Sequence, residues 1–437
     1  MSTSIILKGR KFLLNGGGSA PPVDPPVDVY GLFYPPDQSL SEIPTPVAID
    51  YSQLGYLQKV EDTSFNVPGY KWYIKRLTNG TEWGKTSTQD IMNHYSKTPV
   101  MNCNNTLGII DGKVLDFAGG AFNNGTGTVL KSIAGASVNY QWSSTVPDHF
   151  WHADGTSVYC KNARTDATVF SKSLNSAYGL SSVTKGKSEG CMDIANRYAP
   201  IYAMQDGVQV AGYYDIQNDV LKIKPQTFFS PSLDAGTVKD FITISPYGNY
   251  VIHRNSDTGG TDMQLAMYDM DLNFIKYLGQ GSHEDVQVNQ AGEEVLIQHI
   301  NIGWKRLSDW TDIAGPTFCT VNQSRSFYND DFNGGTPMGG HCSGRNVLRL
   351  GHSYNSNGTP NNRRLQFSLK LDNGENETAL YNFFGFARLQ DPLTPEDYLN
   401  ETKGTCSLDG KYMFASTWWP GAPSRQTFMF WCEKVAV

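Results

Sequence analysis

The sequence has few charged residues and few long stretches of helix-forming residues. Charged side chains make up 18% of its 437 residues, whereas aromatic side chains make up 12% and glycine occurs 43 times. Hardly any stretch combines Ala, Leu, Glu and Lys as long helices do. Because aromatic and β-branched residues favour strands and glycine favours turns, this composition predicts an all-β protein.

Three further absences restrict the class of protein. The seven cysteines show no CxxC spacing, which disfavours a disulfide framework or a zinc knuckle and favours buried free thiols. The formal net charge of -7 disfavours a phosphate-binding surface, so we expect no nucleic-acid partner. No apolar run reaches the roughly 20 residues of a membrane span, and "MSTSIILKGRKFLL" lacks the ordering of a secretory signal. We therefore expect no membrane span and synthesis in the cytoplasm.

A short phrase recurs along the chain. It reads "SPYGNYVIHR" from Ser245, "SLDGKYMFAS" from Ser407 and "NQAGEEVLIQ" from Asn289, and in each case a glycine precedes strand-forming residues. This pattern predicts a tight turn that leads into a strand. Degenerate copies occur at Asn105, Asp148, Asn196 and near Arg345, so the seven turns are centred on residues 105, 148, 196, 248, 292, about 345 and 410.

The spacing of these turns indicates a repeat architecture. Successive turns are 43 to 65 residues apart, close to the period of about 40 to 50 residues of four-stranded propeller blades. A chain of 437 residues is also too long for one compact core, which favours an array of units. The sequence therefore predicts a seven-bladed β-propeller with an extended N-terminal arm. Its fourth blade is expected to contain the strands "DFITISP", "YVIHRN", "QLAMYDM" and "FIKYLG".

We divide the chain into three parts. Residues 1–30 are interpreted as an anchor peptide followed by a Gly- and Pro-rich linker, residues 31–67 as an extended lead-in with a closing strand, and residues 68–437 as the propeller. The closing strand is expected between Ile43 and Tyr56, beside a C-terminal strand from Phe428 to Val435, because such pairing removes an open edge. The expected blades are residues 68–135, 136–185, 186–236, 237–281, 282–335, 336–381 and 382–437.

Four phrases carry a family resemblance. "HYSKTPVMNCNNTLG", "QWSSTVPDHFWHADG", "GGHCSGRN" and "SLDGKYMFASTWW" resemble, in this order, the blade-opening phrases of TolB-like propellers, a group that contains oligogalacturonate lyases. The resemblance covers most of residues 70–437. It is specific for the propeller fold and not for the chemistry, because propellers include enzymes, scaffolds and binding proteins. In the lyase branch it implies histidines at blade starts that hold a divalent metal in the axial channel, beside a bound uronic-acid chain.

His283 and His341 are the candidate ligand-binding histidines, because they stand at two successive predicted blade starts. Two imidazoles and an acidic side chain could bind Mn or Ca, and the acidic candidates are Glu284, Asp285 and Glu401. The third histidine and the glutamine of the lyase branch have no counterpart in register. We therefore predict no metal at His283 and His341 and no cofactor; these side chains would instead bond turn amides.

Arg345 and Lys403 are the candidate catalytic residues of a lyase, since proton abstraction beside a uronate carboxyl needs a base and a cation. Ion pairing with Glu401 or Asp409 is the other interpretation of both residues. Trp418 and Trp419 are candidates for stacking on sugar rings. Trp151, Trp304 and Trp310 are further candidates for the same role. Packing between blades is the alternative for each tryptophan.

Two functions remain open. An anchor, a linker and a compact β head resemble the architecture of decoration and fibre proteins of tailed phages. The first hypothesis is a non-enzymatic, virion-attached propeller that binds host glycans. Its contacts to other virion proteins are made by an extended segment that adds to a sheet edge, through Ile5, Ile6, Leu7, Phe12, Leu13 and Leu14. The alternative is a polysaccharide lyase of the oligogalacturonate type with a metal-assisted site in the channel.

Overall fold

The computed structural model describes residues 3–7, 10–14, 49, 51–63, 69–79, 100–117, 128–132, 140–186, 190–229, 238–256, 264–280, 284–288, 293–298, 304–313, 349–353, 365–369, 381–385, 403–406, 412–417, 422–424 and 426–436. Strands predominate in these ranges. The helices there are short: η1 (Tyr51–Gln53), α2 (Leu174–Tyr178) and α3 (Gln226–Phe229). None of them is long and apolar enough to cross a membrane. The predicted all-β class is confirmed.

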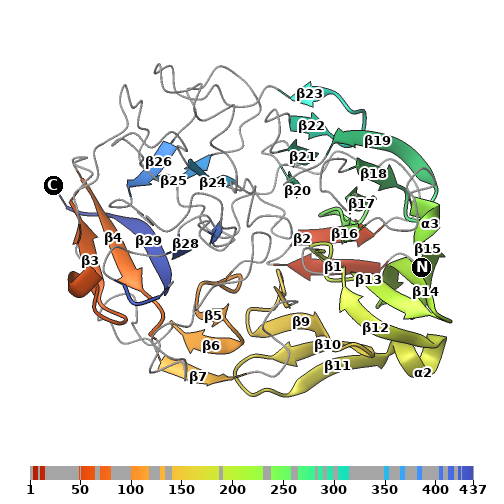
Figure 1. Ribbon diagram of the computed structural model, residues 1–437, viewed down its shortest axis with the longest axis horizontal. Helices are drawn as coiled ribbons and strands as arrows, with labels where there is room; N and C mark the ends of the chain where they lie inside the picture. Colours follow the sequence, from red (N-terminus) through yellow and green to blue (C-terminus); the bar gives the residue numbers. More distant parts are fainter. Residues whose placement is uncertain are drawn as a thin grey trace.

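The described strands form eight sheets, of which one is an isolated hairpin and the other seven surround a common centre (Figure 1). We number these seven as blades 1 to 7. Their strands are β5 (Leu107–Ile110), β6 (Lys113–Asp116) and β7 (Thr128–Ser132) in blade 1; β8 (Gln141–Trp142), β9 (His149–Ala153), β10 (Ser157–Asn162) and β11 (Thr168–Ser173) in blade 2; β12 (Leu180–Lys185), β13 (Tyr198–Gln205), β14 (Val208–Asp215) and β15 (Val220–Pro225) in blade 3; β16 (Val238–Ile244), β17 (Val251–Ser256), β18 (Gln264–Tyr268) and β19 (Phe274–Gln280) in blade 4; β20 (Glu284–Val288), β21 (Glu294–Gln298), β22 (Trp304–Arg306) and β23 (Asp312–Ile313) in blade 5; β24 (Arg349–Ser353), β25 (Leu365–Leu369) and β26 (Tyr381–Gly385) in blade 6; and β27 (Lys403–Cys406), β28 (Met413–Thr417), β29 (Gln426–Lys434), β4 (Tyr70–Arg76) and β3 (Lys59–Asp62) in blade 7.

Blades 1 to 6 are antiparallel meanders in which early strands lie nearer the centre and late strands nearer the periphery, as β5 and β7 or β20 and β23 show in Figure 1. The four strands predicted in blade 4 are β16 to β19, in the predicted order. Three predicted blade boundaries are wrong. β26 runs past the predicted end of blade 6 at residue 381. β12 belongs to blade 3 rather than to residues 136–185, and β4 belongs to blade 7 rather than to the first blade.

Blade 7 is built from both ends of the chain. β29 pairs with β4 at seven positions, from Phe428 opposite Arg76 to Lys434 opposite Tyr70, and β4 pairs in turn with β3. Closure by an N-terminal strand was expected, but β4 and β3 follow the predicted segment from Ile43 to Tyr56. Trp72 and Ile74 of β4 are each 1% exposed, and β4 has hydrogen-bonded partners on both edges. Such a strand closes the ring.

The repeated phrase forms a capped turn, which lies between the first and second strands of blades 3 and 4 and directly before β5 in blade 1. In blade 4 the Ser245 hydroxyl accepts hydrogen bonds from the backbone N–H groups of Asn249 (3.1 Å) and Tyr250 (3.0 Å), and Gly248 has a φ of 70°. Asn102 and Asp193 cap their turns in the same way, with acceptor distances of 2.7 to 3.0 Å to the N–H groups of Thr106, Leu107, Arg197 and Tyr198. The phrase thus needs a short acceptor side chain and, three residues later, a residue that tolerates positive φ.

Asparagine takes the left-handed position in two of these turns. The φ angles of Asn105 and Asn196 are 59° and 54°, and asparagine is one of the few non-glycine residues that adopt this region readily. Asp148, the predicted turn residue of blade 2, does not have a positive φ. There Ser143 caps a turn of different shape, accepting from Val146 N–H at 3.1 Å.

These turns also bond to one another from blade to blade, and we call this series the turn belt. Its bonds run from Asn102 Nδ2 to Pro147 O (2.8 Å), from Ser143 Oγ to Asn196 Oδ1 (2.7 Å), from Ile194 N to Pro246 O (2.8 Å) and from Tyr247 N to Glu294 Oε1 (2.6 Å). The turn belt joins blades 1 to 5 in succession. A phrase that both caps its own turn and bonds to the next blade has to recur at the blade period.

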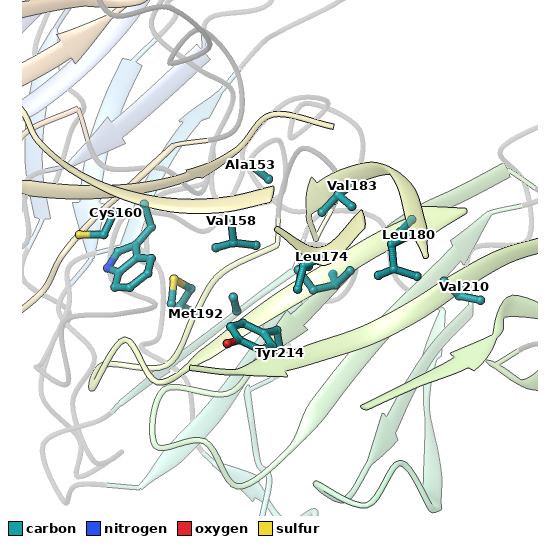
Figure 2. Packing of buried hydrophobic residues seen from close by; sticks show 13 residues of the cluster. Ala153, Val158, Cys160, Leu174, Leu180, Val183, Met192, Val210 and Tyr214 are labelled. Atoms are coloured by element: carbon teal, nitrogen blue, oxygen red, sulfur yellow. The ribbon is translucent and has the colours of Figure 1, made fainter. Parts of the chain in front are cut away.

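Apolar layers fill the spaces between neighbouring blades. Figure 2 shows the layer between blades 2 and 3, where Val158, Leu180 and Val210 are at most 3% exposed. Three ion pairs lie outside these layers and join consecutive blades: Arg164 to Asp116 (2.7 Å), Lys172 to Asp219 (2.6 Å) and Lys222 to Asp271 (2.5 Å). Cys103, Cys160 and Cys191 are buried, as the sequence predicts for its thiols.

The N-terminal arm contains a hairpin. β1 (Thr3–Leu7) pairs with β2 (Arg10–Leu14), so that Ile5 lies opposite Phe12 and Ile6 opposite Lys11. The prediction of one extended segment is therefore wrong for these residues, because the "KG" pair between the strands permits a two-residue connection. The six predicted anchor residues lie in the two strands, and their contacts to a partner stay a prediction.

Candidate functional site

Most of the predicted site residues lie outside the described part of the chain. These are His283, His341, Arg345, Glu401, Trp418 and Trp419. Lys403 is the first residue of β27 and lies opposite Ser416 of β28. The convergence of these residues at a channel mouth stays a prediction.

Among the described residues, no group of three or more His, Cys, Asp and Glu side chains is placed to hold a metal ion. Of the candidate acidic ligands only Glu284 and Asp285 are described, as successive residues of β20 opposite Gln298 and Ile297. The described residues therefore do not supply a ligand set that fits Mn or Ca.

The structure answers the question for two of the tryptophans. Trp151 is 8% exposed and belongs to the buried cluster that blades 2 and 3 share, so packing between blades is confirmed for it. Trp310 is half-buried against the layer between blades 4 and 5. The Nζ atoms of Lys276 and Lys305 lie 5.0 and 5.3 Å from the Trp310 ring centroid, so this ring already has two cationic neighbours.

A set of exposed rings lies at the outer rim of blades 3 and 4, and we call it the aromatic surface: Phe228, Phe274 and Tyr277. Their exposed fractions are 40%, 48% and 49%. Phe228 comes from α3, which follows the outermost strand of blade 3, whereas Phe274 and Tyr277 come from β19, the outermost strand of blade 4. The centroids of Phe274 and Tyr277 are 4.8 Å apart.

Two buried rings support the aromatic surface from below. Tyr268 lies 6.1 Å from Phe228 and 5.8 Å from Phe274, centroid to centroid, and thereby connects the two blades. Phe229 packs against Tyr268 at 5.0 Å, and its carbonyl accepts a 3.1 Å hydrogen bond from the Tyr268 hydroxyl. Because Tyr268 and Phe229 are 2% and 1% exposed, the exposed rings stand on a packed interior.

Two lysines of β15 border the aromatic surface. Lys224 Nζ lies 5.3 Å from the Phe228 ring centroid. Lys222 pairs with Asp271, and the hydrogen bond that it donates to this carboxylate is the main cause that raises the pKa of Lys222. The site thus presents apolar rings and ammonium groups within a chain whose formal net charge is -7.

Sequence reasoning did not identify the aromatic surface. The segment "FIKYLG" predicts a strand, but its residue types resemble those of a buried strand. The exposure of Phe274 and Tyr277 follows from the outermost position of β19, which depends on the order of strands in the blade.

Comparisons with known proteins show the fold. No protein-family description matches the chain, and no curated protein does. Among solved structures, an oligogalacturonate lyase in complex with manganese is similar over 86% of this chain and 97% of its own, with a TM-score of 0.50 and 11% identity. An oligogalacturonate lyase from Vibrio parahaemolyticus has a TM-score of 0.48, with 9% identity over 86% of this chain and 96% of its own. TolB from Acinetobacter baumannii has a TM-score of 0.34, with 11% identity over 70% of this chain and 66% of its own.

At 11% identity, this similarity shows only the fold. The fold of that structure agrees with the ring of antiparallel sheets described above. By its strand order and by this similarity, the chain is an all-β protein with the β-propeller fold.

Proposed function

We propose that the protein is a non-enzymatic propeller attached to a virion, on the capsid or the tail, by its N-terminal arm. There the propeller binds host-surface glycans. The observation that carries this proposal is that the hairpin of the arm pairs with no strand of the ring. β1 and β2 form a sheet of their own, while β4 and β3 supply the N-terminal strands of blade 7. Residues 3–14 are therefore not used to close the propeller.

The physics of a lone hairpin supports attachment. A two-stranded hairpin is marginally stable in water and gains stability when further strands or an apolar face cover it. Addition to a sheet edge of another virion protein would supply that cover. Lys8, Arg10 and Lys11 then favour an acidic partner surface, so attachment should weaken at high salt. The protein would be synthesised in the host cytoplasm and end at the virion surface.

Deletion of residues 2–20 should leave the melting temperature of the propeller almost unchanged and abolish its incorporation into particles. The reason is that the deleted hairpin makes no strand pairs with the seven blades. Thermal unfolding followed by circular dichroism measures the first effect, and the protein content of purified particles measures the second. Deletion of residues 21–30, which keeps the hairpin, is the control. Full occupancy of particles by the shorter chain would refute attachment through the arm.

The alternative is a metal-assisted polysaccharide lyase in the propeller channel, with Arg345 and Lys403 in catalysis and Mn or Ca held by His283 and His341. It is motivated by the sequence resemblance, and one structural neighbour is an oligogalacturonate lyase in complex with manganese. In that chemistry a base removes the proton beside the uronate carboxyl while the glycosidic oxygen leaves, which creates a carbon–carbon double bond.

A metal titration separates the two functions. We expect no calorimetric signal for Mn binding and no anomalous Mn peak at His283 and His341 in soaked crystals. The His283→Ala and His341→Ala double variant should behave like the wild type. A bound ion with ligand distances of about 2.0 to 2.4 Å, lost in this variant, together with unsaturated sugar products, would establish the lyase in place of the binding protein.

A further inference from the structure

The aromatic surface differs from the other exposed apolar residues of the described chain. Val146, Val169 and Val208 are 41% to 52% exposed, but single exposed aliphatic residues are ordinary on protein surfaces. Phe274 and Tyr277 instead contact each other, and the buried Tyr268 connects Phe274 to Phe228, so that the three exposed rings belong to one aromatic cluster. Contiguous exposed apolar patches mark interaction sites.

The rings are held in place by groups behind them. The Phe229 ring stacks on the His253 ring at 4.8 Å with an interplanar angle of 10°, and His253 Nε2 shares a 2.7 Å hydrogen bond with the Tyr202 hydroxyl. Gln226 Nε2 donates to the same hydroxyl at 3.2 Å. A platform fixed in this way loses little conformational freedom when a ligand binds.

The edge of β19 argues against an added polypeptide strand as the ligand. Its pairing with β18 shifts register twice, between Leu265 and Ala266 and between Met267 and Tyr268. Such bulges twist an edge strand and discourage further strand pairing. A ligand that uses ring faces rather than backbone hydrogen bonds suits this surface better, and the apolar faces of sugar rings are of this kind.

We propose that the aromatic surface binds an acidic sugar polymer. Sugar faces stack on Phe274 and Tyr277, and a carboxylate or sulfate of the polymer lies against Lys224. Lys222 is paired with Asp271, so it has a structural role at the border of the site and does not bind the polymer in this proposal. This inference rests on the proposed glycan-binding function and specifies its site and the charge of its ligand.

The test uses the full-length protein and three probes: hyaluronan, which is carboxylated, heparin, which is sulfated, and dextran, which is neutral. We expect binding to at least one acidic probe, weaker binding at higher salt and none to dextran. The Phe274→Ala and Tyr277→Ala double variant should lose about tenfold or more in affinity, because two stacking rings are removed. Lys224→Gln should lose a few-fold, mainly at low salt.

Val146→Ala and Val169→Ala are matched controls, since these side chains are 41% and 52% exposed and belong to blade 2, whereas the aromatic surface lies on blades 3 and 4. Melting temperatures report folding, and Tyr277→Ala alone replaces the double variant if that variant unfolds. Binding to neither acidic probe, equal binding of wild type and ring variants, or full competition by polyglutamate would overturn the proposal. The ring variants should still enter particles, whereas the chain lacking residues 2–20 should still bind the probe, so failure of either proposal is recognised separately.

Discussion

A chain that begins at Leu77, and so lacks β3 and β4, will not form a stable propeller. It loses the seven paired positions with β29 and the buried side chains of Trp72 and Ile74. Removal of one large buried side chain costs about 2–5 kcal/mol, whereas a whole domain is typically stable by only about 5–15 kcal/mol. The edge of β29 would also be open to aggregation. Circular dichroism and size-exclusion chromatography measure both effects, with the chain that begins at residue 21 as the control.

A single substitution makes the same point without truncation. Ile74→Pro removes a backbone N–H from a strand that has partners on both edges, and it should lower the free energy of unfolding by about 3 kcal/mol or more. Ile74→Val should cost only about 0.5–1.5 kcal/mol. Urea unfolding measures both variants. A proline variant as stable as the valine variant would show that β4 is not needed to close the ring.

Replacement of Asp193 by asparagine should change how stability depends on pH. Burial raises the pKa of Asp193 to about 6, in spite of hydrogen bonds from the N–H groups of Tyr198 and Arg197 that lower it. The folded state therefore binds this proton more tightly than the unfolded state, and stability contributed by the protonated form is lost as pH rises from about 4 to about 6. The amide of the Asp193→Asn variant cannot ionise, so the free energy of unfolding of the variant relative to the wild type should rise over this window by on the order of 2–3 kcal/mol.

Urea titrations at several pH values between 4 and 7 measure this difference. Asp215→Asn is the control of opposite sign. Burial alone would raise the pKa of Asp215, but the hydrogen bonds that its carboxylate accepts from Arg197 and Asn218 outweigh burial and lower this pKa. The ionised form of Asp215 stabilises the fold. The free energy of unfolding of the Asp215→Asn variant relative to the wild type should therefore fall as pH rises through the acid range. A pH-independent difference between the wild type and Asp193→Asn would contradict the raised pKa.

The turns were the most predictable part of the fold. Ser245 and Gly248 lie three residues apart, and both act within one local turn, so the sequence contains all that the turn needs. The blade membership of β4 was not predictable in this way, because its partner β29 is some 350 residues away along the chain. Local pattern identifies a strand but not its neighbour.

The candidate site followed the same rule. Histidine is a residue type that binds ligands and metals, so His283 and His341 could be selected from the sequence alone. Their role as ligand-binding residues stays a prediction. The exposed rings of Phe274 and Tyr277 are ordinary strand residues in the sequence, and their exposure is a property of strand order. A surface of this kind is found only when the layering of the blade is known.

The fifth strand of blade 7 has a mechanical consequence under the proposal that the arm attaches the propeller to a larger assembly. Tension on the arm enters the propeller through residues 51–58, where Leu54 and Leu57 are buried, and then reaches β3. β3 is outermost and pairs with β4 at four positions, from Lys59 opposite Lys75 to Asp62 opposite Trp72. These four pairs peel before the seven pairs of β4 and β29 bear load. Under tension, β3 can therefore detach and lengthen the arm while the pairing of β4 with β29 keeps the ring closed.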